Sequence, residues 1–198
     1  MTDPAPRTPD HPVDPAFPAR WSPRAFTDAG MPPADLLTVL EAARWSPSAS
    51  NTQPWRFVYG LRGSTGFAAI AEGLTGGNRD WAPRAAALVV TVAQTEGRDA
   101  GGNPRAQRWA EHDTGAAGLA MALQAERLGY RAHPMGGFDP AALHRALAIP
   151  EAGHRIMAVI AIGRQGPADL LPEQHRPRET PGPRQPLAEL AFEGRFGG

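Results

Sequence analysis

Hydrophobic and polar positions along the chain follow two different periods, which predicts a mixture of helices and strands. Segment 32–44 opens with two prolines, carries an acid in its first turn and then places leucine or alanine at helical intervals. Shorter helical patterns occupy 66–74 and 141–147. A longer one, rich in alanine and glycine, runs from Pro104 to about Leu128. These four patterns are the helices we expect.

Apolar runs predict the strands. Residues 85–93 and 155–163 are almost wholly apolar and contain β-branched side chains, which is typical of strands buried on both faces. Residues 56–59 form a shorter strand-like run, and 129–130 separates the long helix from another short strand. The segment 96–104 is polar and contains glycine, so we expect a loop there.

Both ends of the chain lack a core-forming pattern. Residues 1–19 contain six prolines, so we expect a flexible arm followed by a single domain over residues 20–198. Residues 164–198 also contain six prolines and regain an apolar pattern only near their end. So long a segment without regular structure is uncommon inside a compact monomer. We therefore expect residues 164–198 to wrap a second subunit.

Composition narrows the possible partners and the chemistry. The 198 residues are 41% hydrophobic, enough for a substantial core, and the formal net charge is +0. Neutrality gives no electrostatic reason to bind nucleic acid or an anionic membrane. The apolar runs are far shorter than the roughly 20 residues of a membrane span, and the N-terminus has no apolar secretion segment. We therefore expect a cytoplasmic protein that binds neither nucleic acid nor membrane.

Two residue types are absent. Without cysteine the chain has no disulfide, thiolate nucleophile, iron–sulfur cluster or cysteine-ligated zinc. All 20 basic residues are arginine, and the absence of lysine excludes Schiff-base chemistry and the P-loop motif. Any anion is therefore held by arginine or by backbone N–H groups.

The turn between segment 32–44 and the strand at 56–59 is crowded with hydrogen-bonding side chains. They are Ser46, Ser48, Ser50, Asn51, Thr52 and Gln53. Helix capping requires only one such residue. The carboxamides of Asn51 and Gln53 each donate and accept, which is the pattern that recognises the edge of a heterocycle. A polar surface loop with an Asx-turn at Asn51 is the alternative interpretation.

A second candidate site lies near the start of the domain. Arg20, Ser22 and Arg24 occupy alternate positions, so an extended backbone would direct their side chains to one side. Two guanidinium groups flanking a hydroxyl could hold a phosphate. The alternative is a solvated basic segment.

Paired glycines mark a third candidate site. Gly136 and Gly137 permit a flat ligand to approach the backbone, or they simply form a turn before a helix capped by Asp139. His112 is interpreted as structural because a lone helical histidine seldom acts in catalysis. No dinucleotide glycine fingerprint follows any strand.

Together these residues resemble the nitroreductase family of FMN-dependent oxidoreductases. The resemblance runs from Arg20 to about Phe196, and its most specific mark is Pro47-Ser with Asn51 and Gln53-Pro-Trp. Weaker marks are the segments 20–26, 115–117, 123–125, 128–129, 136–138 and 184–187, together with Asn78. The resemblance implies an α+β fold with a mixed central β-sheet enclosed by helices. It also implies an intertwined homodimer in which each C-terminal extension wraps the partner.

The resemblance further implies an FMN site at the dimer interface. The residues expected at the phosphate and at the pyrimidine side of the flavin are Arg20, Ser22, Arg24 and Arg184. Those expected at the isoalloxazine or substrate cavity, partly from the second subunit, are Pro47, Ser48, Ala49, Asn51 and Gln53. Gly136 and Gly137 are expected beside flavin N5, and Asn78 near the pyrimidine edge. Neither a catalytic side chain nor a metal is expected, because flavin N5 carries the chemistry.

The implied activity is hydride transfer from NAD(P)H through FMN to a small acceptor, such as a nitroaromatic or quinone, by a ping-pong mechanism. The alternatives are a specialised relative, such as a flavin-fragmenting enzyme, a dehalogenase or an enone reductase, and a non-catalytic flavin-binding protein. Relatives often carry a second basic residue two positions before the equivalent of Arg184, where this chain has Gly182. That departure implies weaker FMN binding or compensation by Arg176 or Arg178.

Overall fold

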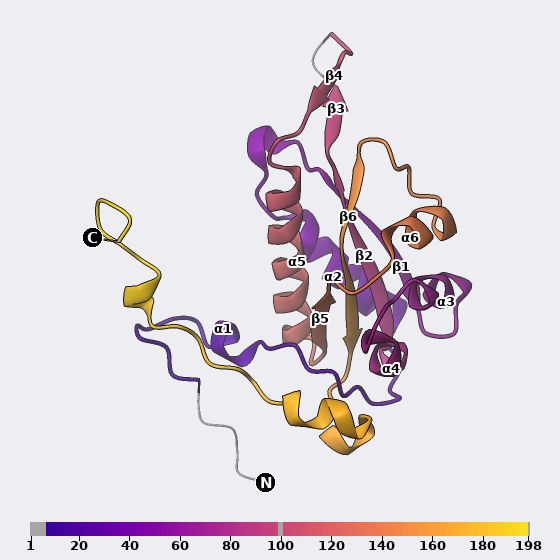
Figure 1. Cartoon of the computed structure of the whole chain (residues 1–198), viewed down its shortest axis with the longest axis vertical. Coiled ribbons are helices and arrows are strands. Elements are labelled where there is room, and N and C mark those ends of the chain that lie inside the picture. Colours follow the sequence, from indigo (N-terminus) through magenta and orange to yellow (C-terminus); the bar gives the residue numbers. More distant parts are fainter. Residues whose placement is uncertain (1–6, 99–100, 198) are drawn as a thin grey trace.

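The computed structural model describes residues 7–98 and 101–197 and is built on a central sheet with helices on both faces (Figure 1). The strands, in their order across the sheet, are β1 (Trp55–Leu61), β2 (Ala87–Gln94), β6 (His154–Gly163) and β5 (Arg131–Met135). Of the expected arm, loop and tail, residues 1–6, 99–100 and 198 lie outside the described residues.

All three strand pairs of this sheet are antiparallel. The expectation of a mixed sheet is therefore wrong for the single chain as far as the structure describes it. The physical reason is the path of the chain after β6. It leaves the sheet as the tail and does not return to the edge of β5, so no parallel strand is added.

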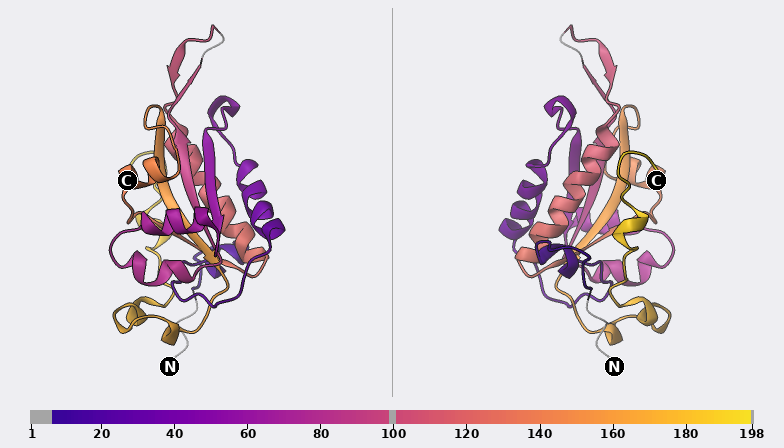
Figure 2. Two further views of the ribbon diagram at one scale, coloured as in Figure 1. Left: turned by 90° about the vertical axis from the view of Figure 1, so that its right-hand side faces the viewer. Right: turned by 90° about the vertical axis from the view of Figure 1, so that its left-hand side faces the viewer.

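Two layers of helices enclose the sheet (Figure 2). One face is covered by α2 (Pro33–Arg44) and α5 (Ala110–Arg127). The other face is covered by α3 (Thr65–Glu72), α4 (Asn78–Trp81) and α6 (Pro140–Ala146). Side-chain caps fix the starts of α3 and α6. Ser64 Oγ accepts the N–H of Phe67 at 3.1 Å, and Asp139 Oδ1 accepts that of Ala142 at 3.0 Å.

Strand β2 is buried on both faces, as its continuous apolar run predicts. Leu88, Val90 and Val92 belong to the core beneath α3, α4 and α6. Val89 belongs to the core beneath α2 and α5. Because successive strand side chains point to opposite faces, an uninterrupted apolar run is needed to fill both cores.

The segment expected as a loop is a small hairpin that projects from one end of the sheet (Figure 1). Its strands are β3 (Glu96–Arg98) and β4 (Pro104–Ala106). At its base the N–H of Gln107 donates to the carbonyl of Thr95 at 2.7 Å. Residues 104–106 thus belong to the hairpin, and the long helix begins at Ala110 rather than at Pro104 as predicted.

The two ends of the chain run side by side away from the sheet (Figure 1). The described arm contains one short helix, α1 (Ala16–Ala19). The described part of the tail forms a β-bridge between Gln165 and Phe26 and then short 3₁₀ turns at Ala168–Leu170, Glu173–Arg178 and Leu187–Glu189. Leu171 is buried, whereas Leu190 and Phe196 are exposed. Among the described residues, no helix combines the length and apolar character needed to cross a membrane.

Candidate functional site

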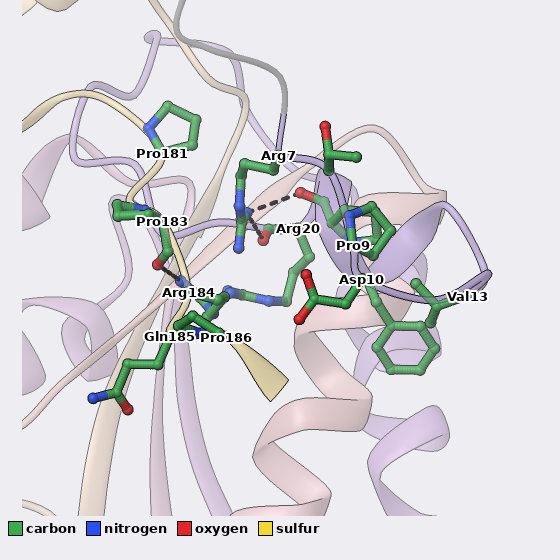
Figure 3. Close-up of a pocket in the computed structure, with 13 residues that line it drawn as sticks. Arg7, Pro9, Asp10, Val13, Arg20, Pro181, Pro183, Arg184, Gln185 and Pro186 are labelled. Carbon is green, nitrogen blue, oxygen red and sulfur yellow. Dashed lines mark hydrogen bonds between the residues drawn. The ribbon is translucent and has the colours of Figure 1, made fainter. Parts of the chain in front are cut away.

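Arginines from both ends of the chain meet in one cavity. Arg20 follows α1 and Arg184 lies in the tail, and both line a cavity of about 760 Å³ between the arm and residues 181–186 (Figure 3). Nη1 of Arg20 donates to Ser22 Oγ at 3.4 Å. Burial, and then the charge of Arg184, lower the pKa of Arg20. The structure therefore brings Arg20, Ser22 and Arg184 together as a positively charged group that includes a hydroxyl.

Arg24 is held in a different way from Arg20. Its backbone N–H donates to both carboxylate oxygens of Glu179 at 2.9 Å, and the N–H of Ala25 donates to Oε1 at 2.8 Å. Nη1 of Arg24 donates to the carbonyl of Arg178 at 3.2 Å. Glu179 thus ties the segment that carries Arg24 to the tail, and the Arg24 side chain turns toward residues 173–178.

Asn78 and Gly137 contact each other across two loops. Asn78 is the first residue of α4, and its Nδ2 donates to the carbonyl of Gly137 at 3.1 Å. A Cβ atom at Gly137 would lie 2.7 Å from that nitrogen, whereas a Cβ at Gly136 would meet nothing within 4 Å. Close approach therefore requires glycine at Gly137 and leaves Gly136 open. The N–H of Gly137 has no acceptor among the described residues.

His133 connects the segment that carries Arg24 with helix α4, which begins at Asn78. It was not among the residues predicted from the sequence. It lies on β5, where its Nδ1–H donates to the carbonyl of Pro23 at 2.9 Å. Its ring centroid is 4.5 Å from that of the buried Trp81 at the end of α4. Burial lowers the pKa of His133 to about 4; the bond to Pro23 opposes the shift and Arg24 adds to it. The sequence did contain one signal for this residue, namely that His133 lies four positions before the candidate residue Gly137.

The crowded turn has an unusual backbone. Its 3₁₀ turn spans Ala49–Asn51, and positive φ angles occur at Ser50 (51°), Asn51 (54°) and Gln53 (47°). Three such residues in one turn are uncommon outside glycine and mark a strained, defined shape. Ser48 Oγ accepts the N–H of Gln53 at 3.0 Å, while the side chains of Asn51 and Gln53 are exposed. The turn therefore presents its two carboxamides outward.

A buried carboxylate holds this turn against α5. Asp113 is 4% exposed, and its Oδ2 accepts the N–H of Ala49 at 2.9 Å. Its Oδ1 lies 3.0 Å from Nδ1 of His112, whose side chain is exposed. Sequence reasoning missed Asp113, because a single acid in the first turn of a helix usually only complements the helix dipole.

The turn and the arginine cavity lie at opposite ends of α5. Asp113 touches the turn from the first part of this helix. Arg127, its last residue, lies 4.0 Å from Asp14 of the arm. Fourteen residues at 1.5 Å rise separate the two contacts by about 21 Å. Within one chain, the predicted residues at 47–53 are therefore not brought together with Arg20 and Arg184.

Several known proteins are similar to this chain. A crystal structure described as an oxidoreductase containing FMN is 43% identical, has a TM-score of 0.94, and matches 100% of both chains. A 15.4 kDa uncharacterised protein of Mycolicibacterium smegmatis is 36% identical over 72% of this chain and 97% of its own. A Streptomyces coelicolor protein, provisionally named NADH dehydrogenase/NAD(P)H nitroreductase, is 31% identical over 80% of this chain and 86% of its own.

The family model described as Nitroreductase family matches residues 18–63 and 63–164. This match extends from the segment that carries Arg20, through the strained turn, to the end of β6. It therefore includes the sheet, both helix layers and every candidate site residue except Arg184. The chain belongs to the nitroreductase family.

Proposed function

We propose that this protein is an FMN-dependent oxidoreductase whose phosphate-binding group is the arginine cavity. The observation that carries the proposal is the convergence of Arg20 and Arg184 on one cavity, with the hydroxyl of Ser22 hydrogen-bonded to Arg20. Planar guanidinium groups match the oxygens of a phosphate, and a hydroxyl adds a further donor. The similar structure described as containing FMN supports the choice of this cofactor.

The flavin ring would lie toward Gly137 and Asn78. Gly137 offers a backbone N–H without an acceptor among the described residues, and Asn78 fixes the loop that carries it. Trp81 and His133 hold the segment of Arg24 against this loop. Bound FMN supplies the hydride chemistry, and the residues of the chain bind it, orient it and restrict access of water.

A second subunit would complete the site. The turn at 47–53 lies about 21 Å along α5 from the arm, so one chain does not present the turn and the cavity to the same flavin. Its outward carboxamides are suited to a site on a partner. The exposed apolar side chains of the tail, Leu187, Leu190 and Phe196, would cover that partner. A homodimer with two shared sites accounts for both features.

The proposed reaction takes hydride from NAD(P)H and delivers it to a small flat acceptor, such as a nitroaromatic or quinone, at the same face of the flavin. A ping-pong order follows, because donor and acceptor would occupy one space in turn. The name of the Streptomyces coelicolor relative supports a nicotinamide donor.

An absorbance spectrum of the purified protein, followed by anaerobic additions of NADPH and NADH, tests the proposal. Flavin bands that bleach with either nucleotide are the expected result. A colourless protein that does not bind added FMN would overturn the cofactor assignment. A yellow protein that neither nucleotide bleaches would keep FMN and overturn the reductase activity.

A further inference from the structure

The arm outside the family match forms one wall of the arginine cavity. Arg7, Asp10 and Val13 line the cavity, yet the family model begins only at residue 18. Asp10 Oδ2 accepts the N–H of Leu187 at 2.8 Å and so fixes the arm to the tail. The wall is thus a feature of this chain that the family core does not include.

Arg7 reaches across this wall to Arg20. Its Nη1 donates to the carbonyls of Pro18 and Arg20, both at 2.8 Å, which places its guanidinium directly beside the segment of Arg20 (Figure 3). Burial, followed by the charges of Arg184 and Arg20, lowers the pKa of Arg7. Three guanidinium groups are therefore close enough to repel one another.

The charge of this group is only partly balanced. Asp10 is the single carboxylate among the residues that line the cavity. Among the described residues, no carboxylate forms an ion pair with Arg7, Arg20 or Arg184, and Asp10 is engaged by Leu187. Three cations against one anion leave a net positive charge, which favours the entry of a further anion. A phosphate dianion would supply that charge.

The basic residues expected to compensate for Gly182 are used differently. Nε of Arg176 donates to the carbonyl of Leu171 at 2.9 Å, and its Nη2 donates to that of Asp169 at 3.3 Å. The carbonyl of Arg178 accepts from Arg24. Neither Arg176 nor Arg178 lines the cavity, whereas Arg7 does.

We propose that Arg7 is a third phosphate-binding cation, supplied by the N-terminal arm in place of the basic residue missing at Gly182. The proposal rests on the proposed function, because the phosphate in question is that of FMN. It assigns the arm a role in selecting the phosphorylated form of the flavin. Riboflavin is the control ligand for this selectivity, because it is the same flavin without the phosphate.

Binding of FMN and of riboflavin to apoprotein, measured by fluorescence titration, tests this role. Arg7→Ala and Arg7→Gln should each weaken FMN binding about tenfold, since one charge-assisted contact is lost, and change riboflavin binding less than twofold. Arg7→Lys should recover most of the FMN affinity. Arg20→Ala is the positive reference, with a loss of roughly ten- to a hundredfold. Arg145→Ala, exposed on α6, is the matched control and should change neither.

Riboflavin guards against a purely structural explanation, because loosening of the arm alone would weaken the binding of both flavins. Equal losses for FMN and riboflavin would show that Arg7 only fastens the arm, and would overturn the proposal. Unchanged FMN binding in both variants would overturn it as well. A wild-type protein that binds neither ligand would instead contradict the proposed function on which it rests. Inorganic phosphate should also raise the Tm of wild-type apoprotein more than that of Arg7→Gln, a readout independent of flavin.

Discussion

Individual residues near the site are held in costly states. His133 is kept neutral between Pro23 and Trp81, and its Nδ1–H is committed to a carbonyl. Gln53 has a positive φ although it has a side chain. Such states persist only where the surrounding structure compensates for them, and they concentrate at functional sites. Each can be tested by one substitution.

Protonation of His133 should destabilise the protein. Its pKa is about 4 in the folded state and about 6.5 in the unfolded chain, so the unfolded state binds the proton first. The stability present above pH 6.5 is therefore lost as the pH falls from 6.5 toward 4. Between pH 7.5 and 4.5, wild type should lose roughly 2 to 3 kcal/mol more than His133→Gln in urea unfolding. If the unfolding free energies of wild type and His133→Gln changed with pH in parallel, the lowered pKa of His133 would be contradicted.

Relief of the strained turn should raise stability and lower activity. Gln53→Gly should stabilise the fold by about 0.5 to 1 kcal/mol, because glycine adopts positive φ without a steric cost. The same change should reduce reductase turnover, since a carboxamide is lost from the proposed site. Ala148 also has a positive φ, of 52°, and lies outside the site, so Ala148→Gly is the matched control. It should stabilise the fold without loss of turnover. Chemical denaturation and steady-state rates measure the two effects.

Whole elements depend on a few contacts between them. Helix α5 joins the strained turn through Asp113 and the arm through Arg127. Because a helix is stiff over this length, it fixes how far apart the two parts of the proposed site lie. The placement of the turn is thus a property of α5 as much as of residues 47–53.

Removal of the Asp113 carboxylate should loosen the turn. Asp113→Ala leaves the N–H of Ala49 without its buried acceptor and should cost about 1.5 to 3 kcal/mol of unfolding free energy. Asp113→Asn keeps an acceptor oxygen and should cost less. Glu111→Ala is the control on the same helix, because it breaks only an exposed ion pair with Arg155 and should cost less than about 1 kcal/mol. Equal costs for Asp113→Ala and Glu111→Ala in urea unfolding would disprove the anchoring role.

The elements of the core could be predicted closely from the sequence, and the links between them could not. The run at 85–93 and the pattern at 32–44 correspond to β2 and α2, because period and burial are local properties. The hairpin at Glu96–Ala106 was missed since its short polar strands pair only with each other. Asp113 and His133 were missed because their roles depend on which distant segments meet. The antiparallel sheet was missed for the same reason, since strand directions depend on how distant strands pair.

At the scale of the whole molecule, the tail has two parts, one packed on the fold and one exposed. Residues up to Glu179 belong to the fold, since Leu171 is buried and Glu179 holds the backbone of Arg24 and Ala25. Beyond Pro186 the tail exposes Leu187, Leu190 and Phe196. An exposed apolar segment of this kind is typical of an interface. The second part is where dimerisation can be tested without harm to the core.

A chain ended after Pro186 should dimerise more weakly. It keeps Leu171, Glu179 and Arg184 but loses the exposed apolar end, so the expected result is a larger monomer fraction on dilution. Sedimentation velocity over a concentration series measures this. Point variants Leu190→Asp and Phe196→Asp should act in the same direction with the full-length tail. An unchanged dimer dissociation constant in all three would remove the tail from the interface.

The hydrogen bond between Asp10 and Leu187 also bears on how the chain could be reconnected. It places Asp10 of the arm next to Leu187 of the tail, although 177 positions separate them in sequence. Folds whose ends are adjacent commonly accept circular permutation. A short glycine–serine linker could therefore join residues 10 and 187 of a trimmed chain, and new termini could open at Gly63, an exposed loop residue whose Cβ position is unobstructed. The order of the elements along the chain would then change, while the cavity between arm and tail would become the inside of a continuous loop.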